Sequence, residues 1–549
     1  MLIRSKIVQK LHEITTKKGW DIAPENIVVE QPPKIQMGDF ATTLPLALVK
    51  SLRRKPVDIA NEIASEFSMD EVASVQPLPN GYINFFFSTP FLQSCFKSVL
   101  ENPRGFISNP SGMGKKALVE FVSANPTGPL TVANGRSAPI GDAIANLLEI
   151  QGYHCDREFF INDMGAKAQK VAKSVFFYYA QQLHHPIPPP EEMYPGDYVP
   201  LLASSYIEKE GDALLHMPPE KAIEVLQEYC ISKMISSIRE DLEFFQIYFQ
   251  SWFKESTLHD GYIQDTFQQL CSQKVVEEKE GAHWFLTTQF GDEKDRVLIR
   301  SNGLPTYLLG DIAYHRNKLE RGYDLCVDVW GADQSHVNPL KWALEVLGFA
   351  SDSLKTVTFQ LVHLFRDNKE VKMSKSGGNY ITLRDLLNEA GPDVSRFVYL
   401  SRSNEQHLNF DLDVAKNRDP KSPVFYAQYA FTRCKGIGRE AEACQIDIPH
   451  RWDDVDISLL TNPSEIQVLR RFAIMPELLD RACSSLAPHL VTQDIHILAN
   501  DFHSFYENCR VIDTTNIELT KARLLLVKGI EQLLSVLFAI IGIQTPERM

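Results

Sequence analysis

One stretch of the sequence, VEFVSANPTGPLTVANGRSAPIGDAIANLLEIQGY (119–153), constrains the fold of this chain most strongly. It opens with an apolar run typical of a buried strand, and Pro126 and Gly128 end that run. From Ile140 onward, apolar residues recur at the spacing of an amphipathic helix. The order strand, loop, helix indicates a parallel α/β sheet, in which ligands bind at the carboxyl ends of the strands. The loop is therefore a candidate binding site.

Three further apolar runs are expected to be strands of the same sheet: DRVLIRS (295–301), LCVDVWGA (325–332) and VTFQLVHLF (357–365). Long helical patterns separate them, as in a parallel α/β fold. A helical stretch at about 165–245 interrupts the strand pattern, and we interpret it as an insertion.

The chain divides into three segments by its local patterns. Residues 1–105 mix helix and strand, and a turn-rich linker at 101–116 follows them. Residues 116–410 carry the α/β pattern, and residues 411–549 are almost entirely helical. We therefore expect an α+β module, a parallel-sheet domain and a separate helical bundle.

Composition excludes several classes of protein. With 549 residues and a net charge of −14, the chain does not coat nucleic acid through a uniformly basic surface. Its nine cysteines include no CxxC pair, which favours a reducing compartment over a disulfide framework or a zinc ribbon. The longest apolar run, LLSVLFAIIGI (533–543), is shorter than the roughly 20 residues that span a bilayer. A cytoplasmic protein without a membrane segment is expected.

The sharpest short motif is VKMSKSGGNY (371–380), which we call the lysine loop. Lys372 and Lys375 stand three residues apart on a segment rich in Ser and Gly. Two ammonium groups at this spacing can bind a polyphosphate while the loop closes over it. The alternative is a flexible, solvated loop without a ligand.

With these motifs, the chain resembles a class I aminoacyl-tRNA synthetase. The residues that flank the motifs resemble those of arginyl-tRNA synthetases. The resemblance rests on EFVSANPTGPLTVANGR, REFFINDMG, YPGDYV, RSNGLPTYLLGDIAYH, VWGADQSHV, the lysine loop and the terminal PERM, in this order. It covers essentially the whole chain. It implies a Rossmann-like catalytic domain, an N-terminal module that contacts the tRNA elbow and a C-terminal anticodon-binding bundle. The substrates it implies are L-arginine, ATP and tRNA(Arg), and we expect a monomer.

The sequence departs from the family in its first signature, His-x-Gly-His. Thr131, Ala133 and Asn134 stand where the family has His, Gly and His. A hydroxyl and a carboxamide can still donate hydrogen bonds to phosphate oxygens, and the following helix would present its N-terminus to them. We therefore predict catalytic roles for Thr131, Asn134, Lys372 and Lys375. ATP contacts are predicted for Gly128, Pro129, Thr131, Asn134, Met373, Ser374 and Ser376.

Arginine recognition requires carboxylates, because a guanidinium presents five donors and keeps its charge. The resemblance places arginine-binding residues at Glu120, Asn125, Glu255, Tyr307, Asp311 and Gln334. Each has a structural alternative. Glu255 could be a solvated helix acid, Tyr307 a core aromatic, Asp311 a helix N-cap and Glu120 the partner of a nearby lysine.

Tyr426 and Tyr429 resemble the family's aromatic positions near the anticodon, although aromatic residues at this spacing also pack within helices. Mg²⁺ is expected to accompany ATP, without a protein metal site. Two other hypotheses stay open: a non-catalytic tRNA-binding paralogue that lost adenylation with its histidines, and a synthetase for another amino acid. The lysine loop argues against the first, and the acids Glu255 and Asp311 argue against the second.

Overall fold

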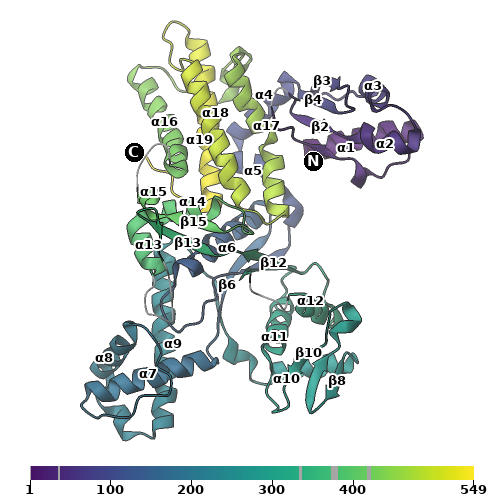
Figure 1. The fold of residues 1–549 in the computed structure, drawn as a ribbon. Coiled ribbons are helices and arrows are strands. Elements are labelled where there is room, and N and C mark those ends of the chain that lie inside the picture. The colour runs from purple at the N-terminus through teal and green to yellow at the C-terminus, as the bar shows by residue number, and fades with distance from the viewer. Residues whose placement is uncertain are drawn as a thin grey trace. The chain divides into compact units, whose positions relative to one another are not determined.

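The computed structural model describes residues 2–34, 37–332, 337–371, 381–416, 422–449 and 451–548. The chain folds into two compact units (Figure 1). The first comprises Met1–Ser111, Asp419–Ile540 and Gln544–Met549, and the second comprises Gly112–Arg418 and Ile541–Ile543. The boundary at residues 111–112 falls inside the turn-rich linker.

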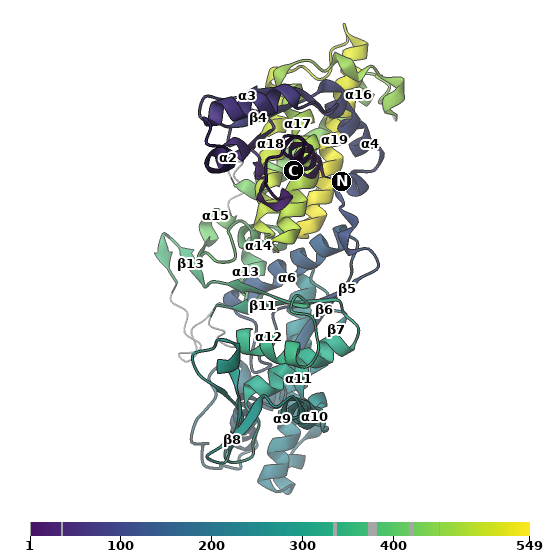
Figure 2. The ribbon, with the colours of Figure 1, turned by 90° about the vertical axis from the view of Figure 1, so that its right-hand side faces the viewer.

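A five-stranded parallel sheet organises the second unit, which confirms the predicted parallel α/β fold. Its strand order is β12-β11-β5-β6-β7, and every neighbouring pair is parallel. The strands are β5 (Lys116–Glu120), β6 (His154–Ile161), β7 (Ser251–Lys254), β11 (Leu325–Gly331) and β12 (Leu354–Phe359). In two views, α6 (Val132–Ile150) lies on one side of this sheet, and α11 (Tyr307–Glu320) and α12 (Val337–Val346) lie on the other (Figures 1 and 2).

Helix α6 begins earlier than its apolar pattern suggested. It starts at Val132 with Thr131 as N-cap, not at Ile140, and nearly all its residues are buried. It is therefore a central helix and not an amphipathic one. Gly141 lets it approach the sheet, because a Cβ there would lie 2.1 Å from the Phe121 ring.

One predicted strand belongs to a different sheet, and another belongs to the parallel sheet only in part. The run 295–301 forms β10 (Arg296–Ile299), which pairs antiparallel with β9 (Ala282–Phe285) in a separate sheet with β8 (Val276–Lys279). The run 357–365 contains the end of β12 and then β13 (Val362–Arg366), which belongs to a third sheet with β14 (Lys369–Glu370) and β15 (Leu408–Asp411). An apolar run marks a strand but does not identify the sheet that the strand joins.

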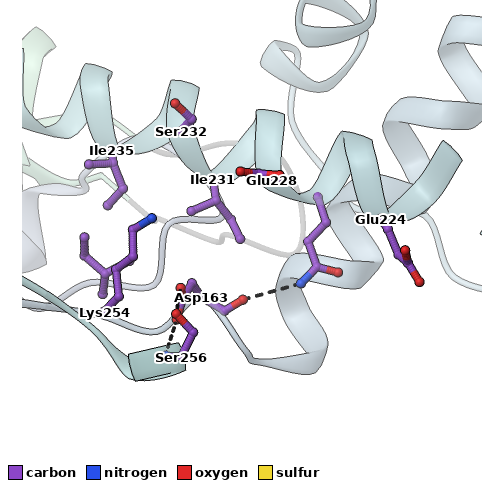
Figure 3. Close-up of a pocket in the computed structure, with 10 residues that line it drawn as sticks. Asp163, Glu224, Glu228, Ile231, Ser232, Ile235, Lys254 and Ser256 are labelled. Carbon is purple, nitrogen blue, oxygen red and sulfur yellow. Dashed lines mark hydrogen bonds between the residues drawn. The ribbon is translucent and has the colours of Figure 1, made fainter. Parts of the chain in front are cut away.

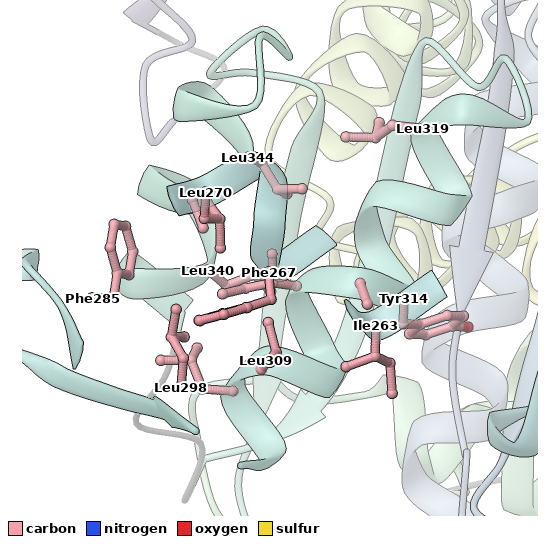
Figure 4. Close-up of a cluster of buried hydrophobic side chains, with 14 of the residues drawn as sticks. Ile263, Phe267, Leu270, Phe285, Leu298, Leu309, Tyr314, Leu319, Leu340 and Leu344 are labelled. Atoms are coloured by element: carbon pink, nitrogen blue, oxygen red, sulfur yellow. The ribbon is translucent and has the colours of Figure 1, made fainter. Parts of the chain in front are cut away.

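Helix α11 is anchored by a hydrophobic cluster (Figure 4). Leu309 and Tyr314 of α11 are buried with residues from α10 (Tyr262–Ser272), α12, β9 and β10. The cluster covers one face of α11, and it therefore fixes the side chains on the remaining faces relative to the sheet.

The remaining helices of the second unit lie outside this layer. The segment 165–245 contains α7 (Ala166–Gln182), α8 (Tyr198–Glu210) and α9 (Pro219–Phe244), which share their own apolar core. The helices α13 (Leu383–Ala390), α14 (Pro392–Leu400) and α15 (Leu412–Lys416) follow the lysine loop.

The first unit combines an α+β module with a helical bundle. The module has the sheet order β1-β2-β4-β3. Its elements are α1 (Ile3–Lys17), β1 (Val29–Glu30), β2 (Phe40–Thr42), α2 (Leu44–Leu52), α3 (Pro56–Glu66), β3 (Val72–Pro77), β4 (Ile83–Phe87), α4 (Thr89–Glu101) and α5 (Pro103–Ile107). The bundle contains α16 (Pro423–Ala443), α17 (Pro463–Ser484), α18 (His489–Asn508) and α19 (Ile517–Ile541).

Helix α19 is longer than its most apolar run. By length and composition alone its 25 residues could cross a membrane, but 67% of its most apolar window is buried inside the structure. This burial is typical of the core helix of a bundle.

Candidate functional site

Thr131 and Asn134 form a capping box at the N-terminus of α6. The Thr131 hydroxyl donates to Asn134 Oδ1 at 2.7 Å, and the Thr131 backbone N–H donates to the same oxygen at 3.2 Å. The Asn134 N–H in turn donates to Thr131 Oγ1 at 3.4 Å. The hydroxyl hydrogen of Thr131 is thus already used. Within the described residues, Asn134 Nδ2 makes no hydrogen bond, so it is the donor that remains for a ligand.

The first turn of α6 offers further donors. The backbone N–H groups of Val132 and Ala133 have no hydrogen-bond partner among the described residues. Helix N-termini with free N–H groups and a positive dipole end favour anions. No acidic residue stands in this turn to oppose an anion. The arrangement suits a phosphate group.

Residues just after the lysine loop lie beside this helix terminus. Thr382, the N-cap of α13, forms a β-bridge with Thr131, and the Leu383 N–H donates to the Leu130 carbonyl at 2.8 Å. The predicted residues Lys372, Met373, Ser374, Lys375 and Ser376 lie outside the described residues. The chain that follows the lysine loop is therefore fixed next to the start of α6.

Two tyrosines of the YPGDYV segment hold the loop between β5 and α6. Tyr194 Oη donates to Thr127 Oγ1 at 2.8 Å, and Tyr198 Oη donates to the Thr127 carbonyl at 2.5 Å. A Cβ at Gly128 would lie 2.8 Å from Tyr198 Oη, so glycine allows this contact. The resemblance included this segment, but reasoning from the sequence assigned no role to either tyrosine.

The loop begins with a strained turn. Val122 and Ser123 adopt positive φ angles of 67° and 37° directly after β5. Such conformations cost about 1–3 kcal/mol each and are concentrated at functional sites. Ser123 Oγ donates to Glu120 Oε1 at 2.8 Å and accepts from the Phe160 N–H at 3.1 Å, which holds the turn between two strands.

Glu255 and Asp311 approach the same edge of the sheet from different elements. Glu255 directly follows β7, and Asp311 lies in the first half of α11, whose C-terminus leads into β11. Because α11 runs antiparallel to the strands, its N-terminal half lies at their carboxyl edge, where α6 also begins.

Among the described residues, Glu255 makes one long contact with a basic group, from Oε1 to His259 Nε2 at 3.9 Å, and Asp311 makes no ion pair. Glu255 Oε2 is buried without a hydrogen-bond partner in the described part of the chain. Burial raises the pKa of Glu255; His259 opposes the rise, and repulsion by Asp163 adds to it. Burial likewise raises the pKa of Asp311 to about 6; Glu120 and Glu255 add to the rise, and His315 and Lys318 oppose it. Two desolvated acids that repel each other form a site for a cation.

The structural alternatives for three residues do not hold. Glu255 begins a short 3-10 turn and is not a solvated helix acid. Asp311 is inside α11, where Thr306 is the N-cap. Tyr307 is 70% exposed and is not a core aromatic. Asn125 is also exposed, so both side chains are open to a ligand, whereas Gln334 lies outside the described residues.

Glu120 contacts a lysine, which is the structural alternative given above for this residue. Its Oε2 contacts the Lys318 ammonium, which also donates to Asp328 Oδ1 at 2.8 Å. His315 Nε2 lies 2.5 Å from Asp328 Oδ2. Glu120, His315 and Asp328 have the spacing of a metal site, but the Lys318 ammonium contacts all three and takes the position of the cation.

A separate cavity of about 520 Å³ lies between α9 and the ends of β6 and β7 (Figure 3). Lys254 and Ser256, which flank Glu255, line it, and Asp163 accepts hydrogen bonds from Ser256 inside it. None of the predicted site residues lines this cavity, so it does not coincide with the predicted arginine site.

In the first unit, Tyr426 and Tyr429 of α16 meet histidines of α18. The Tyr426 ring lies 4.5 Å from the His503 ring, and the Tyr429 ring stacks on His503 at 5.8 Å. Tyr429 remains 46% exposed. The stacked pair therefore leaves one aromatic face open to a planar ligand such as a base.

Comparison with known proteins gives a consistent result along the chain. Three family models match in order: Arginyl tRNA synthetase N terminal domain over residues 1–87, tRNA synthetases class I (R), catalytic domain over 219–415, and DALR anticodon binding domain over 427–549. The arginine–tRNA ligase of Carboxydothermus hydrogenoformans is 37% identical over 552 residues, covering 100% of this chain and 99% of the relative. That of Heliobacterium modesticaldum is 38% identical over 554 residues, covering 100% and 98%. The solved Thermus thermophilus arginyl-tRNA synthetase superposes with a TM-score of 0.79 over 100% of both chains, at 21% identity.

Proposed function

This chain belongs to the arginyl-tRNA synthetase family, and we propose that it binds the guanidinium group of arginine between Glu255 and Asp311. As a class I arginine–tRNA ligase, it joins L-arginine to tRNA with ATP. The arginine carboxylate attacks the α-phosphate of ATP, pyrophosphate leaves, and a ribose hydroxyl of the tRNA takes the arginyl group from the adenylate. Nothing in the relatives or the described residues favours the non-catalytic alternative.

The observation that carries the proposal is the unpartnered Glu255 Oε2 beside an Asp311 whose pKa is raised to about 6. A guanidinium has five donors in one plane and can serve two carboxylates at once. Its arrival would supply the missing hydrogen bond and the missing charge together. Tyr307, one turn before Asp311, and Asn125 are the exposed polar groups that would complete the pocket.

For ATP, the proposed anion site is the first turn of α6. The N–H groups of Val132 and Ala133 and the Nδ2 group of Asn134 are its donors, and Thr131 orients Asn134 through the capping box. None of these groups changes its protonation during the reaction. Lys372 and Lys375 would add positive charge when the lysine loop closes. Gly128 and Pro129 would approach the nucleotide through the loop that Tyr198 holds.

Mg²⁺ is proposed to arrive with the phosphates of ATP, whose charge it neutralises. The described residues do not build a separate cage for it, because the Lys318 ammonium fills the carboxylate cluster at Glu120 and Asp328. No step of the proposed chemistry depends on a protein-bound metal.

For tRNA, we propose that Tyr426 and Tyr429 stack on unpaired bases of the anticodon. We further propose a monomer that works in the cytoplasm, with no membrane contact. All nine cysteines are free, which is compatible with a reducing compartment.

Arginine-dependent pyrophosphate exchange, with and without tRNA, tests the reaction. Citrulline, a neutral isostere of arginine, tests the charge of the pocket. We expect pyrophosphate exchange with arginine and no exchange with citrulline. The background exchange measured with ATP alone should be the same in both experiments. Equal exchange with citrulline in folded protein would contradict recognition by the two acids.

A further inference from the structure

We propose that Asp163 is a positioning residue for arginine recognition: its carboxylate holds Ser256 and thereby fixes the turn that carries Glu255. Asp163 lies in the REFFINDMG segment, where reasoning from the sequence assigned it no role. The proposal rests on the proposed function in one respect, namely that Glu255 binds the guanidinium. The hold on the turn itself rests only on hydrogen bonds between described residues.

Asp163 and Ser256 meet because two parallel strands end side by side. β6 and β7 pair in parallel, and Ile161 is the register partner of Lys254. Asp163 and Ser256 each stand two residues beyond this last pair. Asp163 Oδ1 accepts from the Ser256 N–H at 2.9 Å, and Asp163 Oδ2 accepts from Ser256 Oγ at 2.7 Å (Figure 3). One carboxylate thus uses both of its oxygens on one residue.

This contact leaves Glu255 on the other face of the sheet. Successive residues of an extended chain point to opposite faces. Phe253, two residues before Glu255, packs on Tyr314 of α11 with 5.0 Å between the ring centroids. Asp163 instead lines the cavity beside α9, which Glu255 does not line. Asp163 therefore holds the turn from behind and leaves the space in front of Glu255 to the substrate.

The turn is fixed at both ends. It is a 3-10 turn, Glu255–Leu258, in which Ser256 is the second residue, so the Asp163 carboxylate caps its start. Leu258, at its end, is buried in the cluster that anchors α11. Asp163 is held in turn, because its backbone carbonyl accepts from Gln227 Nε2 of α9 at 3.4 Å. Loss of the two Asp163 bonds would free the end of the turn that bears Glu255.

The charge of Asp163 has two opposing effects on arginine binding. It attracts a guanidinium, but it also makes Glu255 harder to ionise: burial is the largest cause of the raised pKa of Glu255, and repulsion by Asp163 adds to the rise. Asp163 is partly exposed, and solvent therefore screens both effects. Its contribution to recognition is thus mainly geometric.

Steady-state kinetics of the full-length enzyme with its tRNA test the role. Asp163→Ala removes both bonds to Ser256, and the KM of arginine should rise roughly 10- to 100-fold because Glu255 is misplaced. The KM of ATP, and kcat at saturating arginine, should change by less than about twofold. Asp163→Asn should cost less than about threefold, because its Oδ1 can accept from the Ser256 N–H and its Nδ2 can donate to Ser256 Oγ. Ser256→Ala removes only the hydroxyl bond and should cost about two- to fivefold.

Two comparisons show whether Asp163 acts through Glu255. When Glu255→Gln is already present, adding Asp163→Ala should lower kcat/KM for arginine by less than about twofold further. Glu228→Ala is the matched control, because it removes an exposed acid of α9 that lines the same cavity, and it should leave the kinetics unchanged. Equal losses in Asp163→Asn and Asp163→Ala would overturn the inference, as would fully additive losses in the double variant.

Hydrogen exchange measured by mass spectrometry keeps the two proposals separable. Without arginine, residues 255–258 should exchange about tenfold faster in Asp163→Ala than in the wild type, and at the wild-type rate in Asp163→Asn. Unchanged exchange in Asp163→Ala would overturn the inference. If Glu255→Gln leaves the KM of arginine unchanged while exchange responds as expected, the failure lies in the proposed arginine site and not in the hold that Asp163 exerts on the turn. A KM of arginine that rises in Glu255→Gln but not in Asp163→Ala overturns this inference alone.

Discussion

Replacing Asp311 by Asn separates recognition from stability, because the carboxylate that we propose binds arginine is also costly to bury. At neutral pH this group is mostly ionised, since its pKa is about 6. Asn keeps the shape and loses the charge. A charged hydrogen bond in a partly buried pocket contributes about 2–4 kcal/mol, so the KM of arginine should rise roughly 30- to 1,000-fold. The KM of ATP should change little.

The same substitution should stabilise the enzyme when no arginine is bound. Burial raises the pKa of Asp311 from 3.8 to about 6, a rise that corresponds to about 3 kcal/mol of lost stability once the group is ionised. This loss is absent below pH 4, grows as the pH rises, and is complete above pH 6. Asp311→Asn should therefore raise the unfolding free energy at pH 8 by up to about 3 kcal/mol and leave it unchanged at pH 4.

Steady-state kinetics check the predicted KM of arginine, and denaturation with and without arginine checks the predicted stability. Arginine should stabilise the wild-type enzyme and have little effect on the variant. Asp260→Asn, which changes an exposed acid five residues after Glu255, is the matched control and should alter neither measurement. A variant that folds and keeps its arginine KM would refute the recognition argument. A variant that is less stable at pH 8 would refute the desolvation argument.

Three further substitutions test other parts of the chain. Asn134→Ala removes the one side-chain donor left at the start of α6, and it should lower turnover by about 10- to 10³-fold without changing the KM of arginine; unchanged pyrophosphate exchange would contradict it. Lys375→Ala, outside the described residues, should slow adenylate formation by roughly 10²- to 10³-fold in a single-turnover assay, and a loss confined to tRNA affinity would reassign the lysine loop. Asp494→Asn should stabilise the bundle at pH 8 by about 2–4 kcal/mol, because burial raises the pKa of Asp494 to about 7, and the gain should vanish by pH 4 in denaturation experiments.

The parallel sheet could be predicted where its strands are apolar on both faces. β5 and β11 are of this kind, and both were found in the sequence. β6 was not, because Arg157 and Glu158 interrupt its apolar residues. Both are buried: Arg157 pairs with Asp142, and Glu158 with Arg321. A strand whose charges are neutralised by distant residues has no local signature of burial.

Charged residues around the candidate site, such as Glu120, are also neutralised by residues distant in the sequence, and most of them therefore have no local signature of burial. The spacing of the charged residues on α11 is the exception. The resemblance predicted Glu255 and Asp311 as site residues, but it did not predict the charged groups around Asp311. These are His315 and Lys318 of the same helix and Glu120 of β5. Asp311, His315 and Lys318 stand at i, i+4 and i+7, which places them on one face of a helix whose other face joins an apolar cluster. A row of charged side chains on a buried helix needs counter-charges on the strands that the helix covers. Here they are Glu120, at the end of β5, and Asp328, within β11. The spacing alone could therefore have predicted a buried ionic network behind the proposed arginine site, although not which strands supply the counter-charges.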